Sequence, residues 1–141
     1  MAIQGENELK KRIIEEMTVD YSSALEKNFD VAKQFIRVTK DGNVDILFKE
    51  RLTGKEQILL YLIGKLYAKE AGFISTDDVG NKELLDELGI PKGSLLPWLK
   101  NLRDNNRVRR TRKGQYTYHS IPVNMVEKTL RIVEGKMKKF D

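Results

Sequence analysis

The side chains best suited to chemistry in this sequence form a cluster of cations. Eight lysines and arginines fall between residues 92 and 113, where Asp104 is the single acidic residue, so this segment carries a net charge of +7. The whole chain carries +5, which leaves −2 for the remainder. Cations concentrated in one segment favour a polyanionic partner that one face of the molecule would meet. A basic surface that is only solvated is the alternative.

Residues for catalysis or metal binding are scarce. His119 is the only histidine and there is no cysteine, so the sequence offers no histidine-rich metal site, no thiolate zinc site and no thiol nucleophile. We expect His119 at the surface or half-buried, and Asp77-Asp78 in a turn. The segment at Thr53-Gly54-Lys55 lacks the upstream glycine of a phosphate-binding loop. We therefore expect no enzyme, no cofactor and no metal.

Two short helices should carry the first of the basic residues. Residues 81–88 have an apolar leucine face, with Asn81 as the expected N-cap and Gly89 just after the C-cap. The second helix spans residues 92–105. Its buried stripe consists of leucines at i, i+4 and i+7, namely Leu95, Leu99 and Leu102. Ser94 as its N-cap would place Pro97 in the first turn, where proline is tolerated, and would shorten the helix to about 95–105.

A basic hairpin follows at residues 107–118. The pattern alternates Val108, Arg110 and Arg112 against Tyr116, Tyr118 and Ser120. Lys113-Gly114 is the expected turn between the two strands.

This order of elements resembles the winged helix-turn-helix superfamily, in its small prokaryotic or archaeal regulator type. Leu88-Gly89-Ile90 and the three leucines of the second helix match the apolar frame of that superfamily. The resemblance is close over about 50 residues, which include 81–118, and extends to most of residues 53–138 if the flanking helices are counted. It implies a homodimer that binds double-stranded DNA, with the second helix in the major groove and the wing on phosphate or the minor groove.

The residues expected to contact DNA belong to the second helix and the wing. They are Lys92, Ser94, Lys100, Arg103, Arg107, Arg109, Arg110, Arg112, Lys113 and Gln115. The expected role is that of a transcription regulator or a DNA-organising factor. Leu96 and Pro97 stand where the superfamily places polar readers, which predicts weak discrimination among duplex sequences.

An alternative function comes from the same departure. Leu96-Pro97-Trp98 could form an apolar surface for protein–protein assembly, since exposed apolar patches usually mark partner sites. Trp98 and the wing tyrosines could also stack on a single strand of RNA or DNA. The basic wing is not needed for protein assembly, and it favours DNA.

The remainder of the chain predicts an α+β fold that is mainly α. An amphipathic helix is expected over residues 6–27, and a β-hairpin with strands at 34–39 and 44–48. Thr53 and Glu56 form a capping box that opens a helix of about 54–71. Phe73-Ile74-Ser75 could add a third strand beside the wing.

The C-terminal residues predict one more helix. Apolar residues spaced four, three, four and three apart give it one buried seam, made of Val126, Leu130, Val133, Met137 and Phe140. This seam is expected to pack on the domain core or on the N-terminal helix.

These elements predict two regions in the chain. Residues 1–52 form an extension with a helix and a hairpin, and residues 53–141 form the winged domain with its C-terminal helix. The extension and the C-terminal helix are the candidate dimer surfaces. The sequence has no run of about 18 apolar residues and no signal-peptide pattern, which predicts a cytoplasmic protein that does not enter a membrane.

Overall fold

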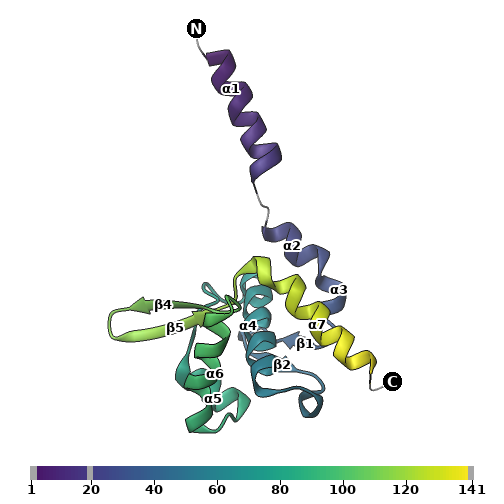
Figure 1. Cartoon of the computed structure of the whole chain (residues 1–141), viewed down its shortest axis with the longest axis vertical. Coiled ribbons are helices and arrows are strands. Elements are labelled where there is room, and N and C mark those ends of the chain that lie inside the picture. Colours follow the sequence, from purple (N-terminus) through teal and green to yellow (C-terminus); the bar gives the residue numbers. More distant parts are fainter. Residues whose placement is uncertain (1–2, 19–20, 140–141) are drawn as a thin grey trace.

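The computed structural model describes residues 3–18 and 21–139 (Figure 1). The fold is α+β and mainly helical, with two small antiparallel sheets. One sheet pairs β1 with β2, and the other has the order β3-β5-β4. Among the described helices, none is long and apolar enough to cross a membrane.

The first part of the chain departs from the continuous helix that we expected. Helix α1 (Ile3–Arg12) passes into a π-helical turn, η1 (Ile13–Met17), and α2 (Tyr21–Lys27) is a separate helix. Thr18 has extended backbone angles (φ −89°, ψ 129°), which ends the helical path. The prediction of one helix over residues 6–27 is therefore wrong. Figure 1 shows α1 pointing away from the rest of the molecule.

The hairpin predicted in the extension is confirmed. After the single turn of α3 (Phe29–Ala32), β1 (Ile36–Val38) pairs with β2 (Val44–Ile46). Gly42 makes the connection with a positive φ of +85°, a conformation that suits glycine. A 3-10 turn, η2 (Lys49–Arg51), leads on from the hairpin.

Helix α4 (Gly54–Glu70) is the centre of the fold. The predicted capping box at its start is confirmed, because Thr53 and Glu56 exchange side-chain and backbone hydrogen bonds. The hairpin β1–β2 approaches α4 at Gly64, where a Cβ would collide with Val44 and Ile36. Residues from both sides of the 52/53 boundary contribute to one continuous hydrophobic core.

The two short helices are present, with changes at their starts. Helix α5 (Asn81–Leu88) is N-capped by Gly80, so the prediction that Asn81 is the cap is wrong. Gly89 ends α5 in the left-handed conformation, as expected (φ +62°).

The second of these helices starts earlier than the capping argument predicted. Helix α6 (Lys92–Asp104) has Pro91 at its N-cap, so Ser94 is not the cap. Pro97 consequently lies inside the helix, beyond the first turn. Because proline has no N–H, one helical hydrogen bond to the Gly93 carbonyl is missing there.

The second sheet consists of β3 (Val79–Gly80), β5 (Tyr116–Ser120) and β4 (Arg109–Lys113). A third strand beside the hairpin was expected, but its assignment to residues 73–75 is wrong. The Phe73 N–H closes the end of α4 by donating to the Ala68 carbonyl, and Val79 pairs with β5 instead.

Helix α7 (Val126–Lys138) follows the short turn η3 (Val123–Met125) and crosses α4. Its predicted packing on the core is confirmed, because Val126, Leu130 and Val133 are all buried. Met137 is partly buried against the same core, and Phe140 lies outside the described residues.

Candidate nucleic-acid interface

A surface groove lies between α6 and the β4–β5 hairpin, and we call it the α6–hairpin groove. Helix α6, the hairpin and the start of α5 supply its lining, which consists of Leu96, Pro97, Lys100, Arg103, Arg110, Thr117, His119 and Asn81. Every charged side chain of this lining is basic. The structure thus brings Lys100 and Arg103 together with Arg110 from a segment that follows the helix.

Strand register decides which basic residues of the hairpin face the groove. Arg110 pairs with His119 and Arg112 with Thr117, so these four side chains share one face of the sheet. Because side chains alternate along a strand, Arg109 and Lys113 lie on the opposite face. The basic side chains of β4 are therefore divided between the two faces of the hairpin, as the alternation of side chains along a strand implies.

The pairing itself differs from the expected one. Tyr118 pairs with Thr111 and Tyr116 with Lys113, so the tyrosines share the face of Thr111 and not that of the two arginines. Lys113 and Tyr116 form the last pair, which leaves Gly114 and Gln115 as the two-residue turn. The expected turn at Lys113-Gly114 was one residue early. Arg112 pairs with Thr117 instead of Tyr116, and this shift of one residue in the pairing exchanges the faces of a strand.

Lys113 is engaged by an acidic partner. Its ammonium lies 2.9 Å from the Asp78 carboxylate and 5.6 Å from the ring centre of Tyr118. The hydrogen bond and the charge of Asp78 raise the pKa of Lys113. Asp77 pairs in turn with Lys69. The adjacent aspartates therefore hold ion pairs in the irregular segment before β3, where no turn is assigned, and their role is structural.

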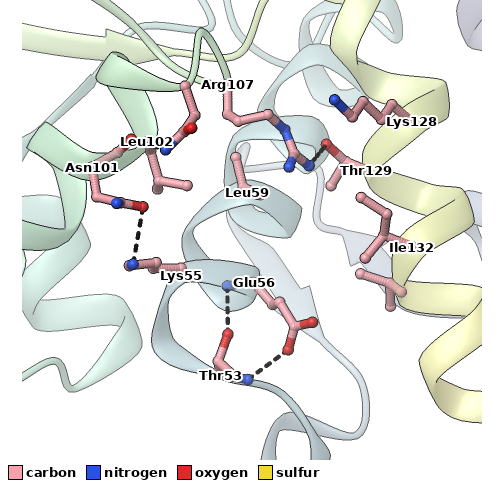
Figure 2. A pocket seen from close by; sticks show the side chains of 12 residues that line it. Thr53, Lys55, Glu56, Leu59, Asn101, Leu102, Arg107, Lys128, Thr129 and Ile132 are labelled. Carbon is pink, nitrogen blue, oxygen red and sulfur yellow. Dashed lines mark hydrogen bonds between the residues drawn. The ribbon is translucent and has the colours of Figure 1, made fainter.

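Arg107 is directed away from the groove. Asn106 adopts a left-handed conformation (φ +59°) after α6, and the Arg107 N–H donates to the Leu102 carbonyl. This reversal turns the Arg107 side chain toward α7, where its Nη2 donates to Thr129 Oγ1 at 2.8 Å (Figure 2). Burial lowers the pKa of Arg107.

His119 is the site residue that the sequence described wrongly. It is only 1% exposed, and its Nε2 lies 2.6 Å from Asn81 Oδ1. Burial, together with the positive charges of Arg103 and Arg110, lowers the pKa of His119 to about 4. The ring is therefore neutral near pH 7. No local signal marks it, because its burial depends on α5 and α6 covering β5.

The other predicted contact residues are spread over α6 and the hairpin tip. Lys92 precedes Leu96 and Lys100 by four and eight positions, which puts all three on one side of the helix. Ser94 lies instead on the side of Trp98, which packs so closely on Gly54 that a Cβ there would collide with its ring. Gln115 is exposed in the turn of the hairpin.

Comparison of the chain with models of known protein families, with curated proteins and with solved structures gave no match. Within the described part of the chain, no group of three or more histidine, cysteine, aspartate or glutamate side chains could hold a metal ion.

Proposed function

We propose that this protein is a winged helix-turn-helix DNA-binding protein, acting as a transcription regulator or a DNA-organising factor. The order of α4, β3, α5, α6 and the β4–β5 hairpin supports the winged assignment. In it α6 would lie in the major groove and the hairpin would be the wing.

The observation that carries this proposal is the all-basic charge of the α6–hairpin groove. Lys100, Arg103 and Arg110 line it, and Arg112 shares the face of Arg110. Lys100 does contact Asp104 at 3.0 Å, but both side chains are exposed and such pairs are weak. Binding of a DNA phosphate backbone to these cations would therefore break only weak contacts within the protein.

The proposal is tested by the salt dependence of binding to duplex DNA. Each cation that neutralises a phosphate adds about 0.9 to the slope of log K against log salt. Replacing both Arg110 and Arg112 by alanine should therefore lower that slope by about 1.8 units, whatever the sequence of the duplex. Fluorescence anisotropy with a labelled random duplex over a range of salt concentrations measures the slope.

The hairpin also provides a matched control. Replacing Arg109 and Lys113 by alanine removes the same charge from the same strand, but from the opposite face. We expect that variant to lower the slope by less than 1 unit. Parental affinity of the Arg110/Arg112 variant at every salt concentration would rule out the groove as the DNA contact.

The alternative function in protein assembly has a smaller surface than the sequence suggested. Leu96 is 61% exposed and Pro97 is exposed beside it, but Trp98 is half-buried against Gly54. The apolar surface of α6 thus reduces to two residues, which lie among the cations of the groove. This arrangement favours DNA over a protein partner.

We further propose that the protein is a homodimer held by the α1–η1 segment (residues 3–17). Four of its apolar side chains have large exposed fractions: Leu9 57%, Ile13 43%, Ile14 56% and Met17 76%. Isolated helices shorter than about 12–15 residues are marginal in water. A helical segment of about this length, with an exposed apolar face, would therefore be stabilised by packing against a partner.

A matching apolar surface lies on the body of the protein. Two adjoining hollows beside α2, α3 and β1 share the side chains of Phe29, Val38 and Tyr67. One hollow carries Lys33 and Arg37, and the other carries Glu26 and Glu70. Within the α1–η1 segment, the basic run Lys10-Lys11-Arg12 lies between two acidic pairs, Glu6 with Glu8 and Glu15 with Glu16. Opposite charges could therefore meet if a second copy placed this basic run on the hollow that carries Glu26 and Glu70.

A further inference from the structure

A cavity of about 370 Å³ lies on the other side of α6 from the α6–hairpin groove. It opens between the start of α4, the end of α6 and the first turns of α7 (Figure 2). Its volume falls within the range of about 300–1,000 Å³ that is usual for small-molecule sites. Asn101 and Asn105 face it from α6, whereas Lys100 and Arg103 face the groove.

Three cations line this cavity, and we call it the cationic cavity. Lys55 comes from α4, Arg107 from the segment after α6, and Lys128 from α7. Lys55 donates to Asn101 Oδ1 at 2.9 Å, and Arg107 donates to Thr129 Oγ1. The ion pairs of the described residues give none of these three cations a carboxylate partner.

Arg107 shows the clearest lack of a partner. Its Nε is buried and has no hydrogen-bond acceptor, although a guanidinium offers five donors. Arg107 as a whole is half-buried. Partial removal of a cation from water without a counter-charge is unfavourable, and a buried donor left unpaired adds to that cost. An anion in the cavity would relieve both.

The acidic residue of the lining does not supply that charge. Glu56 accepts hydrogen bonds from the Lys136 ammonium at 2.6 Å and from the Thr53 N–H at 2.8 Å. Burial alone would raise the pKa of Glu56, but the bonds from Lys136 and Thr53 outweigh burial and lower it. Glu56 is thus already neutralised by its own cation, and the charge of the cavity stays positive.

The remaining lining is suited to an organic group. Leu59, Leu102, Ile132 and Val133 form apolar walls, while Asn101 and Asn105 offer amides. Inorganic phosphate would leave these walls uncovered. We propose that the cationic cavity binds a small organic phosphate of about the size of a nucleoside monophosphate. Its phosphate lies between Arg107, Lys128 and Lys55, and its organic part lies against the apolar wall.

Calorimetric titration of the full chain, at fixed ionic strength and without DNA, tests this proposal. The probes are AMP, GMP, CMP and UMP, with inorganic phosphate and adenosine as comparisons. We expect at least one monophosphate to bind with a Kd below about 1 mM. Adenosine and inorganic phosphate should each bind at least about tenfold more weakly, since adenosine lacks the phosphate that the cations bind and inorganic phosphate lacks the organic part that contacts the apolar wall.

Variants then locate the site. Arg107→Gln should weaken the best probe about tenfold or more, and Lys128→Gln, at an exposed position, about threefold. Arg131→Gln removes the same charge from α7 outside the cavity and should leave the Kd unchanged. Circular dichroism checks that Arg107→Gln is folded, and Lys128→Gln keeps the test decisive if it is not.

Three results would overturn the proposal. One is that no monophosphate binds at millimolar concentration. Another is that Arg107→Gln and Lys128→Gln bind as well as Arg131→Gln. The third is that inorganic phosphate binds as tightly as the best monophosphate. If no nucleotide binds but Arg107→Gln weakens binding to duplex DNA, the cations serve the DNA backbone and the small-molecule site does not exist.

Discussion

At the scale of single residues, His119 shows how the basic groove affects its own lining. The imidazole is buried beneath α6 and hydrogen-bonds to Asn81, while its Nδ1 has no partner. Burial comes first and the charges of Arg103 and Arg110 second in lowering its pKa to about 4. A cationic ring there would be both desolvated and repelled, so the folded state keeps His119 neutral.

This shift predicts how stability depends on pH. His119 has an ordinary pKa of 6.5 when unfolded and about 4 when folded. Above pH 6.5 the ring is neutral in both states. As the pH falls from 6.5 toward 4, the unfolded chain takes up the proton first. The free energy of unfolding should therefore decrease, by at most on the order of 3 kcal/mol.

His119→Gln isolates this contribution, because glutamine can still donate to Asn81 but does not titrate. Urea unfolding near pH 7 and near pH 4.5 should show a larger loss of stability for the parent protein than for the variant. Equal losses in the two proteins would show that His119 takes up a proton as readily in the folded state as in the unfolded chain, which contradicts the lowered pKa. Acidic residues such as Glu56 contribute equally to the pH-dependent loss of stability in both proteins. Subtracting the loss of the variant from that of the parent therefore leaves the contribution of His119.

At the scale of elements, helix α4 joins the N-terminal hairpin to α5 and α6. Lys65 is buried on α4, and its ammonium donates to the Gly42 carbonyl at 2.9 Å and lies 2.7 Å from the Glu83 carboxylate. On the same helix, Val44 and Ile36 pack directly on Gly64 and leave no room for a Cβ there. The hairpin is therefore seated on α4 by both a polar and an apolar contact.

Two glycines inside helices provide a matched test of this contact. Gly64→Ala should lower the free energy of unfolding by about 1–3 kcal/mol, because the added methyl group meets Val44 and Ile36. Gly135→Ala, on α7 with open space around it, should instead raise it by about 0.5–1 kcal/mol. Chemical denaturation measures both. A stabilising Gly64→Ala would mean that the hairpin does not sit on α4 at this distance.

At the scale of the whole molecule, the proposed dimer depends on a segment that the rest of the fold leaves bare. Figure 1 shows α1 extending beyond the body formed by α2 to α7. An apolar stripe held in water is unfavourable by roughly 25 cal/mol per Å² of exposed apolar surface. Two such segments, each placed on the hollows of the other copy, would remove both surfaces from water.

We expect the full-length protein to be a dimer in light scattering at tens of micromolar, and the double variant Leu9→Ser, Ile13→Ser to be a monomer. The reason is that the serines remove the apolar contact but leave the charges of the segment in place. Leu96→Ser is the control, since it removes another exposed leucine from a different surface. A dimer that survives the double variant but not Leu96→Ser would place the interface on α6.

The sequence by itself determined the features that depend on near neighbours. The Thr53 capping box, the Gly89 helix end, both hairpins and the concentration of charge between residues 92 and 113 were all readable, because each depends on residues a few positions apart. The mainly helical α+β class followed from the same periodicities.

The tertiary structure decided what depends on distant contacts. Which cations face the groove depends on the start of α6 before Pro97, on the strand at Val79 and on the register of the β4–β5 hairpin. The burial of His119 and the direction of Arg107 arise only when α5, α6 and α7 cover positions far apart in sequence. Local propensity cannot supply this information, because packing and strand pairing override it where segments meet.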